Sequence, residues 1–518
     1  MRWISTAAQV RALDRRLIEG VGVPGVALME LAARGVADAI LAHHRRAAAR
    51  GTVIVCGSGN NGGDGWGIAR WLHQRAIPVR IWPLAEPRTD DAAIMAEAAR
   101  RLRIPEVGGL QGASLLVDAV FGTGLTRVVE GALAGALAAM DAHPAPVVAV
   151  DLPSGLHADR GSVLGSCPAA VRTVTLGRLK PGLFTEPGAS LAGVVQLVDI
   201  GLAAAATAAA ADAADAADAA DAADAADATA ELPGALDLAP LWPTRPVSAH
   251  KGRSGHLLVV AGSLAMAGAA SLVCQGALAA GVGLVSLAAP RGALVRLASL
   301  PPEVMVLPVD GGAGDGFGER LQRLPELRRF DALAVGPGLG GGAALAGPLA
   351  EQLARLWREH RGPVVFDADA LEATSELGGA GPPRVLTPHP GEAGRLLGWG
   401  TQRVSSDRFA AVEALAVRGT ALLKGRHTLV ASGGRRISVN ATGAPTLATA
   451  GSGDVLTGVV GALLARGVAP HDAARLAAWV HGAAGERLAS TRRGGWRASD
   501  VAAALPDAIE ALSSSGLP

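Results

Sequence analysis

Short apolar runs that end in glycine or in a carboxylate recur along the N-terminal part of the chain. They lie at residues 52–56, 114–118 and 146–151, and a glycine-rich turn after the first run precedes a helical pattern from Gly67 to Arg75. Continuous apolar runs bounded by turn residues are typical of strands that are buried on both faces of a parallel sheet. We therefore expect an open α/β sheet whose ligands gather at the carboxyl ends of its strands.

The C-terminal part of the chain repeats this pattern with different turns. Its apolar runs begin at residues 256, 332, 363 and 384, and segments long enough for helices lie between them. Strands that alternate with helical segments predict a second parallel sheet covered by helices. The expected fold class is therefore two three-layer α/β/α domains.

The stretch from residue 203 to residue 230 is almost entirely alanine, with an aspartate at every third position from Asp212 to Asp227. On a helix of about 3.6 residues per turn, this spacing turns the carboxylates around the axis, so no apolar face forms for docking. Alanine favours a helix, and we expect a semi-rigid acidic linker. The predicted organisation is a domain at 1–202, a linker at 203–230 and a domain at 231–518.

Composition and charge exclude several classes of partner. The chain has 47 Lys and Arg against 46 Asp and Glu, a formal charge of +1, and no long basic block, so we expect no nucleic-acid partner. Cys56, Cys167 and Cys274 lie far apart, which argues against a disulfide scaffold and fits a reducing cytoplasm. The start lacks an apolar signal core and no long apolar run follows, so a cytoplasmic protein outside the membrane is expected.

A glycine-rich turn with a carboxylate stands directly before an apolar helical run near the C-terminus. Gly451 and Gly453 would let backbone amides approach a phosphate, and Asp454 would lie where a base can take a hydroxyl proton. The alternative is an ordinary helix N-cap, because Gly-Asp before apolar residues caps many helices. Read alone, the segment leaves both interpretations open.

Three further features of the C-terminal part are weak individually. The glycine-rich turn around Gly338 could be merely a strand-to-helix turn, and Lys424 could be a surface lysine. His389 lies between two prolines, and a histidine in so rigid a loop is more often functional than part of a core. We interpret these features together with Asp454 as one kinase-like site.

In the N-terminal part, the segment from Gly57 to Gly65 departs from both the dinucleotide fingerprint and the P-loop, since no P-loop lysine follows it. Its adjacent amide side chains and flexible backbone can still donate to phosphate and ribose and offer oxygen atoms to a hard cation. A tight Asn-Gly turn is the alternative. Asp118, the glycines from Gly122, and Asp151 favour the binding interpretation.

Three N-terminal motifs closely resemble, in order and spacing, the NAD(P)H-hydrate epimerase domain. They are Asn60-Asn-Gly-Gly-Asp64-Gly, Val117-Asp118-Ala-Val-Phe-Gly122-Thr-Gly-Leu and Val150-Asp151-Leu-Pro-Ser154-Gly-Leu. The resemblance implies a Rossmann-like domain with Asp151 as the catalytic carboxylate near the reacting ring, and a potassium ion ligated by Asn61, Asp118 and Ser154. It also implies that the phosphates and ribose of the substrate are held by Asn60, Asn61, Gly62, Gly63, Asp64, Gly122, Thr123, Gly124, Leu125, Thr126, Arg127 and Val128.

The order of the C-terminal motifs is similar to that of the NAD(P)H-hydrate dehydratases of the ribokinase-like superfamily. Further matching segments are Lys251-Gly-Arg-Ser-Gly-His256, Met266-Ala-Gly268-Ala269 and Phe366-Asp367-Ala-Asp369-Ala-Leu371. The resemblance implies that Asp454 is catalytic and binds the substrate hydroxyl, and that Ala269, Gly338 and His389 contact the hydrate. It implies a site for ADP, accompanied by Mg²⁺, formed by Lys424, Gly425, Arg426, His427, Thr428 and Gly453.

The two resemblances together imply a bifunctional repair enzyme. It would interconvert the R and S hydrates NADHX and NADPHX, and dehydrate the S form to NAD(P)H at the expense of ADP, with release of AMP and phosphate. Its partners would be these small molecules, and we expect a homo-oligomer. The main alternative is a ribokinase-like kinase of a small molecule fused to a regulatory nucleotide-binding domain. A second alternative makes the N-terminal part a pure binding module, against which the retention of Asp118 and Asp151 argues.

Overall fold

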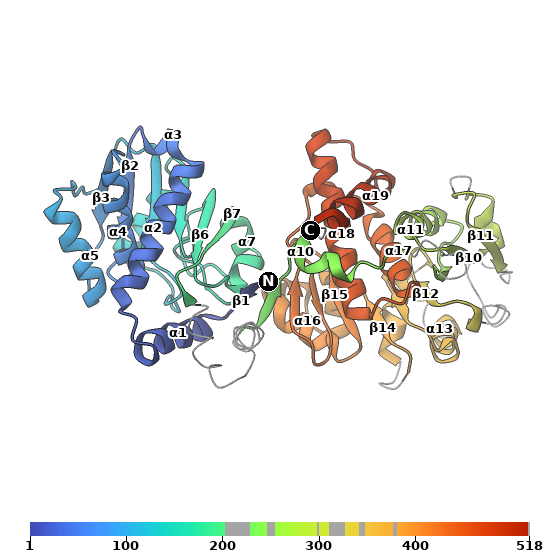
Figure 1. Ribbon diagram of the computed structural model, residues 1–518. Helices are drawn as coiled ribbons and strands as arrows, with labels where there is room; N and C mark the ends of the chain where they lie inside the picture. Colours follow the sequence, from blue (N-terminus) through green and yellow to red (C-terminus); the bar gives the residue numbers. More distant parts are fainter. Residues whose placement is uncertain are drawn as a thin grey trace. The chain divides into compact units, whose positions relative to one another are not determined.

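The computed structural model describes residues 1–202, 228–245, 254–297, 300–309, 327–340, 348–376 and 381–515. Internal contacts divide the chain into two compact units (Figure 1), one from Arg2 to Ala230 and the other from Glu231 to the C-terminus, with Met1. Most of the predicted linker, residues 203–227, lies outside the described residues. Residues 228–230 lead into strand β8 (Ala230–Leu232).

The first unit contains a parallel sheet with the strand order β3-β2-β4-β5-β6-β7. Alternate residues of its central strands enter two separate cores: Ile54 and Cys56 face one, and Val53 and Val55 face the other. Because both faces are buried, the strands read as continuous apolar runs, as the sequence predicts. The strands of this sheet are β2 (Thr52–Cys56), β3 (Val79–Pro83), β4 (Leu115–Ala119), β5 (Val147–Val150), β6 (Arg172–Leu176) and β7 (Val194–Val198), and strand β1 (Arg2–Ile4) lies outside it.

The helices of the first unit cover both faces of this sheet. Helices α2, α4 and α5 pack against one another and contribute to one core, whereas α6 contributes to the other. Helix α1 is followed directly by a π-helical turn (Arg16–Gly20). The helices are α1 (Ala7–Arg15), α2 (Gly25–His43), α3 (Arg45–Ala48), α4 (Asn60–Gln74), α5 (Asp90–Arg101), α6 (Gly131–Asp141) and α7 (Gly188–Leu191).

The expected glycine-rich turn before residue 67 is wrong over residues 60–66, because α4 already begins at Asn60. The glycines serve close packing. A Cβ at Gly63 would lie 2.6 Å from Met29 Sδ, one at Gly65 would lie 2.7 Å from Ala119 Cβ, and one at Gly62 would overlap the carbonyl of Gly57. Glycine normally disfavours a helix interior, but here it lets α4 approach the sheet and α2 more closely than a side chain would allow.

In the second unit the sheet runs in the order β17-β16-β15-β14-β13-β12-β9-β10-β11. The strands from β15 to β11 are parallel, and β16 and β17 add an antiparallel edge. The strands are β9 (His256–Val260), β10 (Leu284–Pro290), β11 (Met305–Val309), β12 (Ala332–Val335), β13 (Val364–Phe366), β14 (Arg384–Leu386), β15 (Thr420–Leu423), β16 (Leu429–Ala431) and β17 (Ile437–Val439).

Helices α11, α17, α18 and α19 pack together on one face of this sheet, and α13, α14 and α16 lie on the other (Figure 1). Helix α17 is buried almost all round, and its backbone meets that of α11 directly, since a Cβ at Gly458 or Gly276 would overlap main-chain atoms of Val273 or Val455. The helices are α10 (Ala235–Leu238), α11 (Ala267–Ala279), α12 (Arg291–Leu294), α13 (Pro348–His360), α14 (Pro390–Leu397), α15 (Thr401–Ser406), α16 (Arg408–Ala416), α17 (Ser452–Ala465), α18 (Pro470–Thr491) and α19 (Ala498–Ser515).

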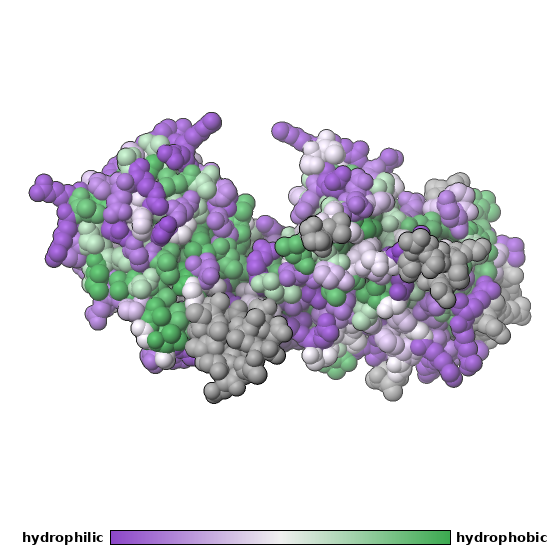
Figure 2. Space-filling model, viewed as in Figure 1, coloured by the Kyte–Doolittle hydropathy of each residue, from purple (hydrophilic) through white to green (hydrophobic). Residues whose placement is uncertain are grey.

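Three features of the described residues, the surface, the helices and the cysteines, correspond to what the composition predicts. Figure 2 shows hydrophilic residues spread over the visible face of both units, with hydrophobic residues between them. Within the described ranges, none of the helices combines the length and the apolar character that a membrane crossing requires. Cys56, Cys167 and Cys274 are all free thiols, so the expectation that they form no disulfide scaffold is confirmed.

Candidate active sites

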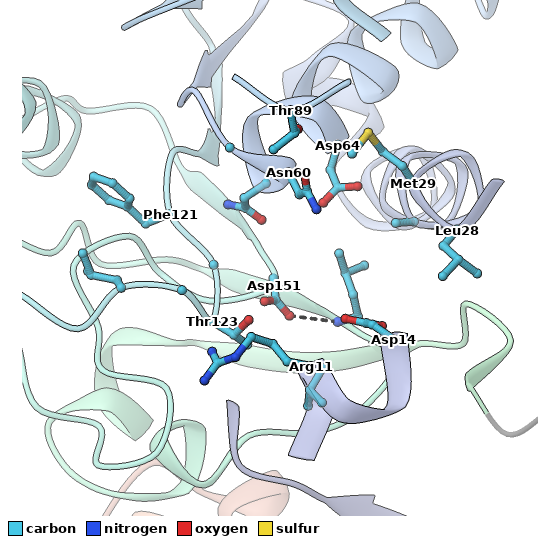
Figure 3. A pocket seen from close by; sticks show the side chains of 18 of the residues that line it. Arg11, Asp14, Leu28, Met29, Asn60, Asp64, Thr89, Phe121, Thr123 and Asp151 are labelled. Atoms are coloured by element: carbon cyan, nitrogen blue, oxygen red, sulfur yellow. Dashed lines mark hydrogen bonds between the residues drawn. The ribbon is translucent and has the colours of Figure 1, made fainter. Parts of the chain in front are cut away.

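A cavity of about 800 Å³ opens in the first unit where the chain leaves β2, β4, β5 and β6 (Figure 3). Parallel strands present their carboxyl ends at one edge, which is where open α/β sheets bind ligands. The structure brings together here a large share of the residues predicted for the epimerase site. Those that line the cavity are Asn60, Asn61, Asp64, Gly122, Thr123, Gly124, Leu125, Thr126, Arg127 and Asp151.

Five residues predicted for this site are placed elsewhere. Gly62 and Gly63 are buried within α4, where they support packing, and the Val128 side chain is 56% exposed beyond the cavity lining. Asp118 and Ser154 lie beneath the lining and are fully buried. The structure therefore separates a cavity surface from a buried polar layer under it.

Asp151 stands directly after β5 with a backbone φ of +67°, a left-handed conformation that is uncommon for residues other than glycine. Its Oδ1 accepts a hydrogen bond from the ammonium of Lys180, shown as the dashed line in Figure 3, and a weaker one from the Leu176 amide at 3.3 Å. The Lys180 side chain is only 1% exposed, and its Nζ also donates to Thr175 Oγ1 at 3.1 Å and to the Leu176 carbonyl at 2.9 Å. A buried lysine thus fixes the orientation of the predicted catalytic carboxylate.

Two more carboxylates line this cavity, Asp64 on helix α4 and Asp14 on helix α1 (Figure 3). Burial, followed by the charges of Asp151 and Asp14, raises the pKa of Asp64 well above its ordinary value. Burial also raises the pKa of Asp14 to about 6, an effect that nearby Lys180 opposes and Asp151 reinforces. The cavity therefore holds groups that can exchange protons near neutral pH.

Below the cavity, Asp118 is held entirely by neutral donors among its described contacts. Its Oδ2 accepts from the Ser154 amide at 2.7 Å, and its Oδ1 accepts from Ser154 Oγ at 2.5 Å and from the Val120 amide at 3.3 Å. Burial raises the pKa of Asp118 to about 6, although these hydrogen bonds lower it. The Asn61 Nδ2 atom, also buried, has no hydrogen-bond partner in the structure.

Sequence reasoning missed Lys180 and Asp14, both of which line the cavity. Lys180 follows strand β6, so the rule that turns after strands carry functional residues extends to it, although residues 172–176 were not among the apolar runs singled out. Asp14 lies on the amphipathic helix α1, which is far from the motifs in sequence. Only the tertiary fold shows that the two belong to one site.

In the second unit, the start of helix α17 carries the predicted carboxylate. Gly451 caps this helix with a φ of +87° and has no side chain to occupy the first amides, and Asp454 lies in the first turn. Burial raises the pKa of Asp454 to about 7, Asp367 and Asp369 add to this, and Lys424 opposes it. His481 on α18 donates from Nε2 to the Ser452 carbonyl at 3.0 Å and so anchors the same turn.

Lys424 follows β15 and is embedded among carboxylates. Its Nζ lies 2.7 Å from Asp367 Oδ1 and 3.8 Å from Glu392 Oε2, and the other Asp367 oxygen accepts from Thr457 Oγ1 at 2.6 Å. The pKa of Lys424 is raised: burial lowers it, but the charges of Asp367, Glu392 and Asp454 outweigh that effect. The interpretation of Lys424 as a surface lysine is therefore wrong, because its side chain is only 19% exposed.

The other predicted dehydratase residues fall into separate groups. A Cβ at Gly338, whose φ is +67°, would lie 2.9 Å from Ala269 Cβ, and one at Gly453 would lie 3.4 Å from Lys424 Nζ. These pairs bring Ala269 next to Gly338, and Gly453 next to Lys424. The loop after Lys424 turns outward, with Gly425 and Arg426 exposed and His427 in a left-handed conformation, and Thr428 Oγ1 donates to the Gly425 carbonyl at 3.2 Å.

His389 has a structural role that the sequence did not reveal. Its Nδ1 accepts hydrogen bonds from the amides of Gly391 at 3.0 Å and Glu392 at 3.3 Å, and Glu392 bonds back to the His389 amide at 2.8 Å. This is a capping box at the start of α14, with histidine in place of the usual serine or threonine. Because Nδ1 accepts, the ring proton is on Nε2, and the side chain remains 53% exposed and accessible.

Among the described residues, no three or more His, Cys, Asp or Glu side chains are grouped to hold a metal ion. A cation in the first unit would therefore need amide, hydroxyl or carbonyl oxygens beside at most two carboxylates.

Two family models match the chain. The model described as the YjeF-related protein N-terminus matches residues 25–182, and that of NAD(P)H-hydrate dehydratase matches residues 257–507. The solved ADP/ATP-dependent NAD(P)H-hydrate dehydratase from Bacillus subtilis, co-crystallised with ATP and Mg²⁺, aligns with a TM-score of 0.49 at 27% identity. That alignment covers 55% of this chain and 99% of that one.

Relatives that match nearly the full length carry both halves. The bifunctional NAD(P)H-hydrate repair enzyme Nnr of Moorella thermoacetica is 38% identical over 95% of this chain and 93% of its own length. The enzyme of the same name from Pyrobaculum aerophilum is 36% identical over 97% of both chains, and that from Escherichia coli is 33% identical over 91% of this chain and 87% of its own. With identity above 30% over almost its whole length, this chain belongs to the family of bifunctional NAD(P)H-hydrate repair enzymes.

Proposed function

We propose that the second unit dehydrates the S form of NADHX and NADPHX with ADP as phosphoryl donor. The observation that carries this proposal is the position of Asp454, in the first turn of α17 beside Lys424 and with a pKa of about 7. A carboxylate with that pKa takes up a hydroxyl proton more readily than one at its ordinary value. Asp454 therefore has the properties required of the base.

The chemistry follows from this placement. Asp454 accepts the proton of the C6 hydroxyl as that oxygen attacks the terminal phosphoryl group of ADP, and AMP leaves. The amides from Gly451 to Gly453, at the positive end of α17, offset the charge that develops on the phosphoryl oxygens. Phosphate then departs from C6 far more easily than hydroxide would. Electron release from the ring nitrogen assists this departure, and loss of a proton from C5 then restores the C5–C6 double bond of the dihydropyridine of NAD(P)H.

We assign nucleotide binding to Gly453 and to the segment of Lys424, Gly425, Arg426, His427 and Thr428. Lys424 lies 2.7 Å from Asp367 and contributes a buried positive charge next to Gly453. Mg²⁺ would bind through the nucleotide's phosphates and offset their charge during transfer. Ala269, Gly338 and the exposed Nε2 edge of His389 are assigned to the hydrate.

The first unit, on this proposal, interconverts the R and S hydrates in the cavity of Figure 3. The loop 122–127 and the start of α4 hold the phosphates and ribose, which suits a cavity edge that carries the glycines of this loop and Arg127. Asp151, fixed by Lys180, lies at the reacting ring and exchanges a proton with the hydrate. The first unit thereby supplies the S form that the second consumes.

Potassium is assigned to Asn61, which lines the cavity, and to Asp118 and Ser154, which are buried beneath it. The residues fit the ion, because Asp118 is fully buried and its described partners are all neutral donors. The Phe121 carbonyl, which accepts a hydrogen bond from Ser154 Oγ at 3.4 Å, offers a further hard ligand nearby. A bound monovalent cation would offset the charge of Asp118 and hold the 120–127 loop under the substrate.

One experiment tests both halves. R and S hydrates are incubated with ADP or ATP, and the dihydronicotinamide absorbance is followed for wild type, Asp151→Ala and Asp454→Ala. We expect the Asp151 variant to consume only the S form and the Asp454 variant to consume neither. Accumulation of a phosphorylated substrate would instead indicate a kinase, and wild-type protein that leaves R untouched would make the first unit a binding module.

A homo-oligomer in the cytoplasm stays a prediction. Light scattering of the purified full-length chain would measure its oligomeric state.

A further inference from the structure

Two carboxylates from distant parts of the first unit flank one buried ammonium. Lys180 donates directly to Asp151, and Asp14 faces the same ammonium from helix α1 (Figure 3). Both carboxylates line the cavity, and the Asp14 side chain is only partly exposed. Asp14 is thus a half-buried ionisable group that lines the proposed reaction cavity.

The fold fixes α1 against the Lys180 segment. Ile4, just before α1, forms a parallel bridge with Leu179, and the Ser5 amide donates to the Leu179 carbonyl at 2.9 Å. The Ala7 amide at the helix start donates to Asp159 Oδ1 at 2.7 Å. Hydrogen bonds at the start of α1 thus hold the helix that carries Asp14 against the segment that carries Lys180.

Among the described contacts, the Asp14 carboxylate forms no ion pair, although the Lys180 ammonium is nearby. Lys180 directs its three donors to Asp151, Thr175 and Leu176. Burial raises the pKa of Asp14 to about 6, with Asp151 raising it further and Lys180 lowering it. The charged groups that line the cavity with Asp14 are Arg11 on the same helix, Asp64, Asp91, Arg127, Asp151 and Lys180.

We propose that Asp14 is the second proton-transfer group of the epimerase half, with Lys180 as the residue that positions Asp151 opposite it. This inference rests on the proposed epimerase function. Asp151 removes the hydroxyl proton of the hydrate while the C6–N1 bond breaks, and its electron pair goes to N1, which takes the proton of Asp14. The product is an open-chain aldehyde.

The reverse steps restore every group. Rotation about C5–C6 presents the other face of the aldehyde to N1, which re-forms the bond to C6 and returns its proton to Asp14. The oxygen recovers its proton from Asp151. No electrons are gained or lost, no co-reactant is needed, and one acid and one base suffice, which is what the two carboxylates can supply.

The test follows conversion of pure R hydrate to S by chromatography, without nucleotide so that the other half is silent, over a range of pH. In wild type, kcat/KM should fall as the pH rises above about 6, because Asp14 must begin protonated. Asp14→Asn should lower kcat by about 100-fold or more, with KM little changed and that titration lost. Asp14→Glu should recover part of the rate together with the titration.

Lys180→Met gives a signature that a structural role would not produce. Without the ammonium, which lowers the pKa of Asp14, the alkaline limb should move to higher pH while the maximal rate falls. Glu19→Gln, on the exposed turn after α1, is the matched control and should behave as wild type. Thermal melting and the rate on S hydrate with nucleotide report whether each variant is folded.

The outcomes separate the two proposals. If wild type does not convert R to S, the proposed epimerase function is wrong. If wild type converts R to S and folded Asp14→Asn keeps its rate and pH profile, or folded Lys180→Met leaves the alkaline limb in place, the role of Asp14 and Lys180 is overturned and the epimerase function stands.

Discussion

Asp454→Asn tests whether the carboxylate at the start of α17 is the base of the dehydratase half. Its pKa of about 7 arises first from burial and then from the charges of Asp367 and Asp369, with Lys424 opposing. Asparagine keeps the size of the side chain and removes both its charge and its capacity to accept a proton. The variant should lose the activity on S hydrate by at least about 100-fold.

The pH dependence of the wild type follows from the same pKa. Only the ionised form of Asp454 is a base, so the rate should fall as the pH decreases through about 7. At about one pH unit below that value roughly one tenth of the enzyme is active, whereas a carboxylate with its ordinary pKa would give no change in that range.

The stability of the folded protein should rise as the pH decreases, whereas the rate falls. A carboxyl whose pKa is raised from 3.8 to about 7 favours the protonated native state, so its ionisation makes the native state progressively less stable as the pH rises from about 4 to about 7. The shift corresponds to roughly 4 kcal/mol above that window. Asp454→Asn should therefore unfold at higher urea concentration than wild type at about pH 8, and at the same concentration below about pH 4.

The assay pairs urea titrations at several pH values with rates on purified S hydrate. The reasoning about burial and neighbouring carboxylates fails if the wild-type rate is flat from about pH 8 to about pH 6. It also fails if the variant shows no gain in stability at the alkaline end. An active Asp454→Asn enzyme would refute the assignment of the base itself.

Three further predictions concern the buried charges and the close packing of the sites. Gly122→Ala should lower epimerase kcat/KM by up to about 100-fold, because the added Cβ would lie 2.9 Å from Asp151 Oδ2, and conversion of R hydrate measures this. Lys424→Met should cost about 3–5 kcal/mol of stability in urea titrations, since it leaves the carboxylate of Asp367 buried and unpaired. Replacing K⁺ by a large organic cation should slow epimerisation and spare dehydration, because buried Asp118 would lose the counter-ion proposed for it.

Each of these predictions has its control. Gly135→Ala lies in helix α6 with open space around its Cβ and should leave both activities intact. The double variant Lys424→Met with Asp367→Asn should recover part of the lost stability, and no recovery would mean that the pair is not the cause. Equal slowing of both activities without K⁺ would place the ion elsewhere or make the effect one of ionic strength.

The strand-and-turn pattern predicted most of the scaffold, because buried parallel strands carry an apolar signal that local sequence contains. The strands beginning at residues 52, 256 and 384 are confirmed. The glycines at the start of α4 were misread as a turn, since their reason is contact with Met29 and Ala119, which lie far away in sequence. Local sequence propensities place glycine in turns. They do not predict that a helix packs closely enough on its neighbours to require glycine.

The candidate sites likewise contain residues that local motifs predict and contacts that only the tertiary fold creates. Residues in motifs, such as Asp151 and Asp454, could be singled out from their turns, and the structure places both beside a buried lysine. Asp151 meets Lys180 only once the sheet has formed. The same is true of Asp14, which comes to this site on helix α1 near the N-terminus. The raised pKa values of Asp14 and Asp454 are likewise products of burial, which no local pattern contains.

The bare main-chain contact between α11 and α17 has a consequence for engineering the dehydratase half. Ala269 lies in the first turn of α11 and Asp454 in the first turn of α17, so the glycines Gly276 and Gly458 set the spacing between the two. Because main-chain atoms of the two helices are already in contact there, the distance between Ala269 and Asp454 is fixed by packing in the core. Efforts to broaden the substrate range should therefore redesign the outward-facing loops and leave Gly276 and Gly458, where α11 and α17 meet, unchanged.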